Sequence, residues 1–218
     1  MTLTRRAALG LLAAGALATL TPRLAPAASL PPALRFRILR DGRQIGTHAV
    51  RFEVAGNGMR VSTAIDIEVK IAFIPAFRFS HRGTERWEDD RLVELKGTTN
   101  ENGERFEVSG KLVGTKLQII APNGTTLADP TAFTTNDLWN RDAVQAKNLV
   151  DAHHGGLVGI VSRAEDDEDI AADGQELAAS RYRVITPFLA GTIWYDGTGR
   201  WRKSDFEIKG ERVEYRPA

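Results

Sequence analysis

The sequence contains no cysteine among its 218 residues. It can therefore form no disulfide, and it offers no thiolate for an iron–sulfur cluster, a haem, a metal centre or a lipid anchor. An excess of charge of one sign is also lacking, because 29 lysines and arginines balance 28 aspartates and glutamates. A nearly neutral chain has no electrostatic basis for binding nucleic acid, so nucleic acid is not expected as a partner.

The motifs of common enzyme families are absent as well. The sequence has no Gly-x-Ser-x-Gly elbow, no phosphate-binding glycine loop and no dinucleotide fingerprint, so no cofactor is predicted. The four histidines, at positions 48, 81, 153 and 154, lack the spacing of zinc ligands, and the acidic run 165–169 lacks the order of a calcium loop. We therefore predict no metal site, interpret the acidic run as a solvated loop, and regard an enzyme as the less expected class.

The first 27 residues have the three parts of a signal peptide. Arg5 and Arg6 precede an apolar run over residues 11–20, and Ala25-Pro26-Ala27 is a small-residue cleavage site. Paired arginines are typical of twin-arginine signals, although Ala8 stands where a bulkier apolar residue is usual, which leaves the general secretory route open. The apolar run is shorter than the roughly 20 residues that cross a bilayer, so the mature form should have no transmembrane anchor. The sequence thus predicts a signal peptide over 1–27, one β-rich domain over 28–218, and a periplasmic or secreted location.

Turn signals divide the rest of the chain into short alternating segments. Five dipeptides favour the positive φ angles of tight hairpins. They are Asp41-Gly42, Asn57-Gly58, Asn102-Gly103, Asn123-Gly124 and Asp196-Gly197. Such a density of hairpin signals is typical of a meander of antiparallel strands.

The longest alternating segment runs from Arg60 to Phe73. One face of it carries Val61, Thr63, Ile65, Ile67, Val69, Ile71 and Phe73. A strand of that length should be strongly twisted or curled. A hairpin is expected over residues 77–95 with its turn at 88–91, and a short helix over about residues 134–147. We therefore predict a mainly β fold, either a single curled antiparallel sheet or a partly open β-barrel, with one short helix.

A curled sheet that a helix covers on one side can enclose a hollow wider than its own side chains fill. Aromatic rings line such pockets as well as cores, so the candidate ligand-binding residues are Phe79, Trp87 and Trp139, with Ile67 and Val69 from the long strand. The interpretation is a protein that binds or carries a hydrophobic or amphipathic ligand, or a cell-envelope factor with an envelope protein as its partner. A core filled by the same side chains is the alternative.

Two other functions stay open at this point. His81 and Glu85 share a face of the expected hairpin and, if the fold added His153 or His154, could form an acid–base site in the cavity. That alternative requires a void beside His81, and it fails if His81 is buried and fully paired. The second alternative is an assembly factor whose exposed edge strand pairs with another envelope protein.

Several short segments resemble a family of exported bacterial proteins of unknown function. They are Arg82 to Trp87, Leu92-Val93, Asn102 to Phe106, Leu138-Trp139-Asn140, Trp194 to Gly197 and Val213-Glu214-Tyr215. Together they cover nearly the whole mature chain and are similar to the DUF6134 family, which is related in pattern to the DUF3108 proteins. The resemblance implies a single β-rich periplasmic domain without an established reaction or catalytic residues. By analogy of shape it also implies the half-barrels that carry lipids or lipoproteins across the periplasm.

Overall fold

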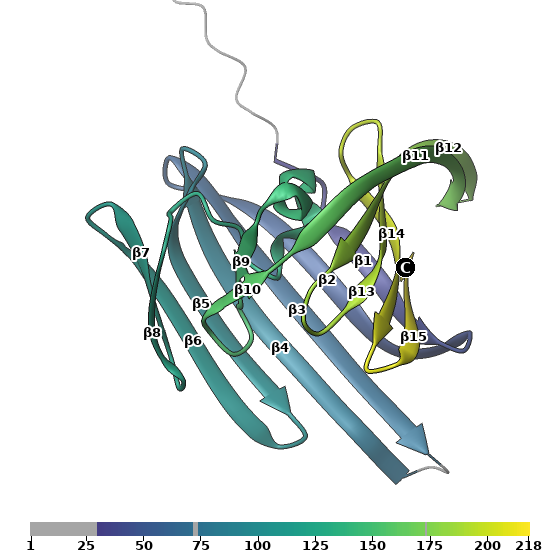
Figure 1. The fold of residues 1–218 in the computed structure, drawn as a ribbon, viewed down its shortest axis with the longest axis horizontal. Helices are drawn as coiled ribbons and strands as arrows, with labels where there is room; N and C mark the ends of the chain where they lie inside the picture. The colour runs from purple at the N-terminus through teal and green to yellow at the C-terminus, as the bar shows by residue number, and fades with distance from the viewer. Residues whose placement is uncertain (1–29, 72–73, 173) are drawn as a thin grey trace, which may run out of the picture.

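The computed structural model describes residues 30–71, 74–172 and 174–218, so the predicted signal peptide lies outside the described residues. Thirteen strands form one antiparallel sheet in the order β11-β12-β13-β14-β15-β1-β2-β3-β4-β5-β6-β7-β8 (Figure 1). Their bounds are β1 Leu34–Arg40, β2 Arg43–Ala55, β3 Gly58–Ile71, β4 Ile74–Glu88, β5 Arg91–Glu101, β6 Glu104–Val113, β7 Lys116–Ala121, β8 Gly124–Ala128, β11 Val161–Ala172, β12 Gln175–Ile185, β13 Ala190–Asp196, β14 Trp201–Ile208 and β15 Glu211–Pro217. Among the described residues the first and last strands of this order, β11 and β8, do not pair, so the sheet is curled but open. The predicted fold class is confirmed.

Local sequence explains most of the meander. In β3 the side chains of Val61, Thr63 and Ile65 are buried, as the alternating pattern predicts, while Phe73 lies outside the described residues. The turn between β4 and β5 is formed by Asp89 and Asp90, whose φ angles of 48° and 57° suit a tight hairpin. Hairpins or short loops join the strands from β1 to β8 and from β11 to β15 in succession, so neighbouring strands within each of these two runs are antiparallel. β15 pairs antiparallel with β1 and joins the two runs into one sheet.

The helix predicted over about residues 134–147 is wrong. The segment instead forms two short 3₁₀ turns, η1 Asp137–Trp139 and η2 Arg141–Gln145. Asn140 between them has extended backbone angles (φ −99°, ψ 118°), and its side chain accepts a hydrogen bond from the Asp142 amide at 3.0 Å. Asparagine often bonds to nearby backbone in this way, which competes with a continuous helix.

The acidic run 165–169 is not a loop either. It lies within β11, an edge of the sheet, and a bulge interrupts the pairing with β12 between Glu165 and Glu168. Arg181 on β12 forms ion pairs of 3.0 Å with both of these glutamates. Charged side chains and bulges on an edge strand hinder its pairing with another chain.

The chain between β8 and β11 crosses the concave face of the sheet. We call residues 129–160 the insert. It contains η1, η2 and a small two-stranded ribbon, β9 Asn148–Val150 with β10 Leu157–Gly159, which lies over the middle of the sheet in Figure 1. The Leu92 amide of β5 bonds to the Pro130 carbonyl at 2.7 Å, and Val144, Leu149 and Val150 join the main hydrophobic core. The insert therefore fills part of the space that the curled sheet surrounds.

Over the same described residues, no helical segment has the length and apolar character needed to cross a membrane.

Candidate functional site

One row of paired residues crosses the concave face and organises the site. Cross-strand pairing places Phe36, His48, Ile65, His81 and Thr99 side by side on β1, β2, β3, β4 and β5. All five side chains are buried. The insert covers the His81 and Thr99 end of this row, whereas the other end borders a cavity.

His81 lies under the insert and is completely buried, with 0% of its surface exposed. Both of its ring nitrogens are hydrogen-bonded. The Asn136 amide group donates to Nε2 at 3.1 Å, which places the ring proton on Nδ1, where it bonds to the Thr99 hydroxyl at 2.9 Å. The Asn136 oxygen accepts from Nε2 of His153 at 3.2 Å. Burial holds the pKa of His81 far below its usual range and lowers the pKa of His153 to about 4, so both rings are neutral.

Two buried carboxyl groups anchor the start of the insert. Glu85 on β4 accepts hydrogen bonds from the Thr134 hydroxyl at 2.7 Å and from the Trp87 indole at 3.1 Å. Asp137 accepts from the Thr134 amide at 2.6 Å and from the Trp139 indole at 2.9 Å. Burial and the neighbouring Asp137 raise the pKa of Glu85 well above its usual range, and burial also raises the pKa of Asp137. The two carboxyl groups, through Thr134, Trp87 and Trp139, act as a structural clamp between β4 and the insert.

Two glycines allow the insert to approach the sheet this closely. Gly83 on β4 and Gly97 on β5 are directly paired. A Cβ at Gly83 would lie 2.9 Å from Nδ2 of Asn136 in the insert and 2.7 Å from Nε2 of His81, and a Cβ at Gly97 would lie 2.6 Å from the Ala152 carbonyl oxygen of the insert. Neither position tolerates a side chain without movement of its neighbours.

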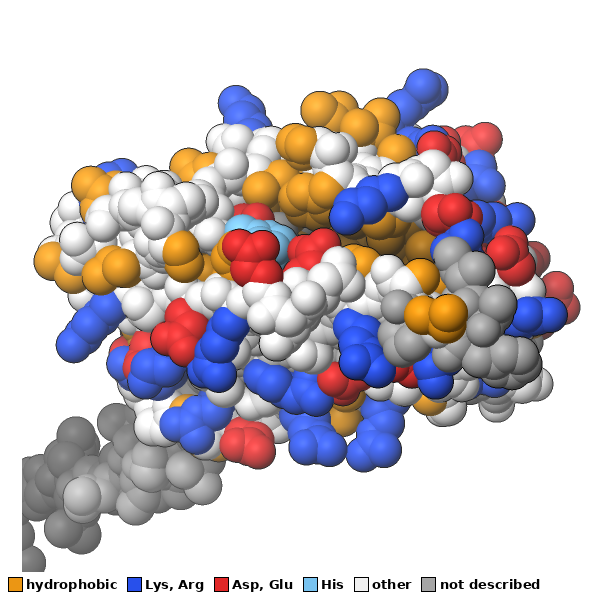
Figure 2. Space-filling view, turned by 90° about the horizontal axis from the view of Figure 1, so that it is seen from below, with side chains coloured by type: hydrophobic (Ala, Val, Ile, Leu, Met, Phe, Trp, Pro, Cys, Tyr) orange, Lys and Arg blue, Asp and Glu red, His pale blue; other side chains and the backbone are white. Residues whose placement is uncertain are grey.

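Beside the insert lies a cavity of about 440 Å³. It separates two parts of the curled sheet, which we call its arms: β2 to β5 on one side, and β12 to β15 on the other. One wall comes from β3 and β4 and the opposite wall from β14 and β15. The insert and the connection between β12 and β13 line most of the rest, with Thr135, Leu138, Asp151, His153 and His154 from the insert and Phe188 and Leu189 from the connection. The principal apolar lining residues are Ile65, Ile67, Phe79, Trp201, Phe206 and Tyr215. Figure 2 shows this face with a hydrophobic hollow whose rim carries acidic, basic and histidine side chains.

His48 lies in the wall of this cavity with 5% of its surface exposed. Its ring is surrounded by those of Phe36, Trp201 and Tyr215, with centroid separations of 6.3, 5.5 and 5.9 Å. Both ring nitrogens are buried, and neither has a hydrogen-bond partner among the described residues. Burial, with a smaller contribution from His153, lowers the pKa of His48 to about 3, so the ring is neutral.

The mouth of the cavity is polar. Lys209, in the turn between β14 and β15, lies 3.5 Å from a carboxylate oxygen of Glu101, whose other oxygen lies 3.5 Å from Nε2 of His154. Nδ1 of His154 lies 3.5 Å from Asp151. These four residues all line the cavity and join β5, the insert and the β14–β15 turn.

The structure places two of the five predicted ligand-binding residues, Ile67 and Phe79, in the cavity wall. Trp87 and Trp139 instead donate to the buried carboxyl pair, and Val69 lines a separate surface depression with Lys70 and Arg40. His81 and Glu85, the weak catalytic candidates, belong to the network under the insert and do not line the cavity.

Four of the cavity residues that the predicted set did not include are aromatic or histidine side chains of β2, β14 and β15. They are His48, Trp201, Phe206 and Tyr215. A signal existed for His48, because it alternates with Val50 and Phe52 on one face of its strand. The other three residues face the cavity only because β14 and β15 curl toward β2 and β3. No local sequence pattern predicts that curvature.

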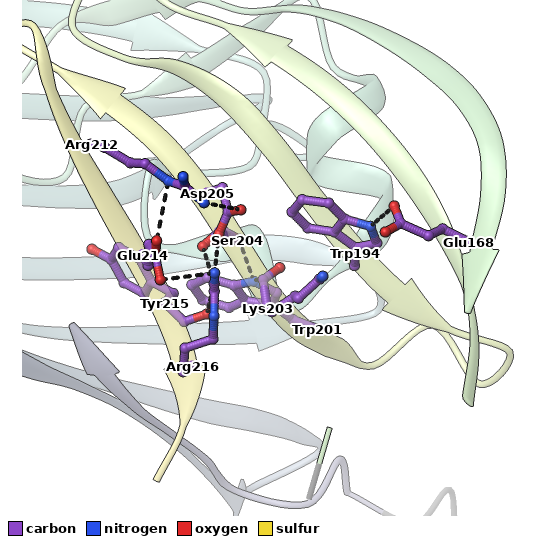
Figure 3. Close-up of polar contacts among 10 residues, drawn as sticks. All are labelled: Glu168, Trp194, Trp201, Lys203, Ser204, Asp205, Arg212, Glu214, Tyr215 and Arg216. Atoms are coloured by element: carbon purple, nitrogen blue, oxygen red, sulfur yellow. Dashed lines mark hydrogen bonds and ion pairs between the residues drawn. The ribbon is translucent and has the colours of Figure 1, made fainter. Parts of the chain in front are cut away.

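The outer face of the same arm is occupied by paired charges. Arg216 bonds to Asp205 at 2.6 Å and to Glu214 at 3.0 Å (Figure 3). Trp194, another aromatic residue of this arm, donates to Glu168 at 3.0 Å, and the Lys203 ammonium lies 4.2 Å from its ring centroid. Since these groups satisfy one another, the cavity on the concave face is the better candidate site.

Comparisons with known proteins agree with this architecture. A family model described as "Domain of unknown function (DUF6134)" matches residues 36–218. No curated protein sequence matches the chain. The structure is similar to the crystal structure of a beta-barrel-like protein of domain of unknown function DUF1849 from Brucella abortus, with a TM-score of 0.61 and 13% sequence identity over 85% of this chain and 94% of that chain. At this sequence identity the similarity shows a common fold, and no activity can be inferred from it.

Proposed function

Because the chain belongs to the DUF6134 family, a domain of unknown function, we propose its function from the cavity: it binds a small hydrophobic or amphipathic molecule. The observation that carries this proposal is the apolar hollow of about 440 Å³ between β3, β4, β14 and β15. This volume lies within the range of about 300–1,000 Å³ that is usual for small-molecule sites.

The lining suits an apolar body with a polar end. Aromatic and aliphatic side chains form the walls, and the charged side chains gather at the mouth, where Glu101, Asp151, His154 and Lys209 lie. An amphipathic molecule could place its apolar part against Ile67 and its polar part among these groups or in solvent. The walls belong to paired strands of one sheet, which favours a preformed site.

Export is part of the same proposal. The paired Arg5 and Arg6, the apolar run and the small-residue site ending at Ala27 support a signal peptide, and with it a periplasmic protein that carries its ligand within the cell envelope. The relation in pattern to the DUF3108 proteins also stays a prediction.

The two alternatives receive less support. An acid–base site at His81 and Glu85 needs a free nitrogen beside a void, whereas the hydrogen bonds of His81 are complete and the ring lies under the insert. An assembly role through an edge strand is disfavoured at β11, because its acidic run and bulge hinder pairing.

A fluorescence titration with N-phenyl-1-naphthylamine tests the proposal. The purified protein should bind this apolar dye saturably, and Ile67→Trp should weaken binding by about tenfold or more because the larger ring fills the cavity. Ile120→Trp, at an exposed position of β7 that does not line the cavity, is the matched control and should bind like the wild type.

Native mass spectrometry of protein purified from its own host provides a second readout, with a co-purified lipid-like molecule as the expected result. Dye binding that is absent, or that is the same in the wild type and Ile67→Trp, would overturn the proposal.

A further inference from the structure

His48 lies in the cavity wall, and the proposed function assigns no role to its two ring nitrogens. Both of its ring nitrogens are buried without a partner, although buried polar groups in proteins are nearly always hydrogen-bonded. His81 and His153 are bonded through Asn136, and His154 lies between two carboxylates. Among the described histidines, therefore, His48 is the one whose two ring nitrogens are both buried without a partner, and it lies at the wall of a cavity.

We infer that the molecule bound in the cavity carries an uncharged hydrogen-bonding group, a hydroxyl or a carbonyl, at its innermost end, and that this group bonds to His48. The inference rests on the proposed function and specifies the class of ligand.

The surroundings of His48 leave the cavity as the direction of approach. Phe36, Trp201 and Tyr215 pack around the ring, but none of them forms a hydrogen bond with either nitrogen of His48. His48 also lines the hollow, but neither ring nitrogen has appreciable accessible surface there, so a group in the cavity can bond to the imidazole only after the ring turns about its Cβ–Cγ bond, which exchanges the positions of ring nitrogens and carbons.

The charges along the cavity favour an uncharged group at this end. Of the described lining residues, Lys209 is the only lysine or arginine, and it lies at the mouth beside Glu101. A carboxylate next to His48 would lie among aromatic rings with no cation to pair with, and burial of an unpaired ion is very unfavourable. An ammonium group faces the same cost. A neutral imidazole has one donor and one acceptor, so a hydroxyl can bond to either nitrogen and a carbonyl can accept from the N–H.

The test compares ligands of equal chain length that differ only at one end. 1-Decanol, 1-chlorodecane and decanoate each displace N-phenyl-1-naphthylamine from the wild type, from His48→Leu and from His48→Gln. The preference for decanol over chlorodecane should fall by about tenfold in His48→Leu, because the hydrogen bond is lost. His48→Gln, which keeps a donor and an acceptor, should retain most of the preference. Decanoate should bind more weakly than decanol to the wild type.

The outcomes separate the two proposals. If the dye binds in the cavity but the decanol preference is the same in the wild type and His48→Leu, or if decanoate binds more tightly than decanol, this inference is wrong and the proposed function stands. If the dye does not bind, or Ile67→Trp leaves its binding unchanged, the proposed function fails and this inference with it.

Discussion

His48 and His81 occupy the same row of the same sheet, two strands apart, yet their environments are opposite. Ile65 lies between them as the paired neighbour of both. His81 bonds through both nitrogens to Thr99 and Asn136, whereas neither nitrogen of His48 has a partner. The contrast shows that strand position alone does not decide what a buried histidine does.

The covering element makes the difference. The insert brings Asn136 and Thr134 against β4, so polar groups there find partners and the space is filled. On the other side β14 and β15 bring Trp201 and Tyr215, which pack against His48 but cannot fill the cavity beside it. One half of the concave face is a structural network and the other half is the candidate binding site.

The largest expected effect comes from removing His81. His81→Leu leaves the buried Thr99 hydroxyl and the Asn136 amide without a partner, and should lower the free energy of unfolding by about 4 kcal/mol. His48→Leu removes no hydrogen bond and should leave stability at pH 7 equal or higher. Urea denaturation of both variants measures the comparison, and equal losses in the two variants would show that the two sites do not differ as described.

A steric change on the insert side should have the next largest effect. Gly97→Val places a side chain against the Ala152 carbonyl, which is backbone and cannot move cheaply, and should lower the free energy of unfolding by about 3 kcal/mol. Gly197→Val, at a glycine with nothing near its Cβ position, is the control and should cost far less. A Gly97→Val protein as stable as the control would mean that the insert is not held closely against β5.

The smallest of the three effects concerns pH. The unfolded chain binds a proton at His48 near pH 6.5, but the folded chain does not until about pH 3, so the stability present above pH 6.5 is lost progressively as the pH falls. Between pH 7 and pH 5 this amounts to about 2 kcal/mol. His48→Leu should reduce the loss between these pH values by that amount, as chemical denaturation at each pH would measure. A variant with the same pH dependence as the wild type would contradict a neutral, buried His48.

Sequence patterns predicted the strands, but they did not predict which parts of the fold pack against each face of the sheet. Period-two alternation placed Ile67 and Phe79 on the concave face, and the structure puts both in the cavity wall. The same pattern placed Trp87 on that face as well, but the insert covers it and Glu85 accepts its indole hydrogen bond. Alternation states which side of a sheet a residue faces, and it contains no information about the element that lies against that side.

The errors have the same origin. A short polar segment such as 134–147 has a helix-like start signal, but its conformation follows from the bonds that Thr134 and Asp137 make within the fold. The acidic run 165–169 resembles a loop because charged residues are uncommon in strands, yet an edge strand tolerates them.

The sequence by itself determined that this chain is a meander of antiparallel strands, because side-chain alternation and hairpin turns are local properties of the backbone. Only the tertiary structure decided that the insert fills one half of the curled sheet and that an apolar cavity with an unpaired His48 remains in the other. That outcome depends on contacts between residues far apart in the chain, such as His81 with Asn136 and His48 with Trp201, which no local pattern encodes.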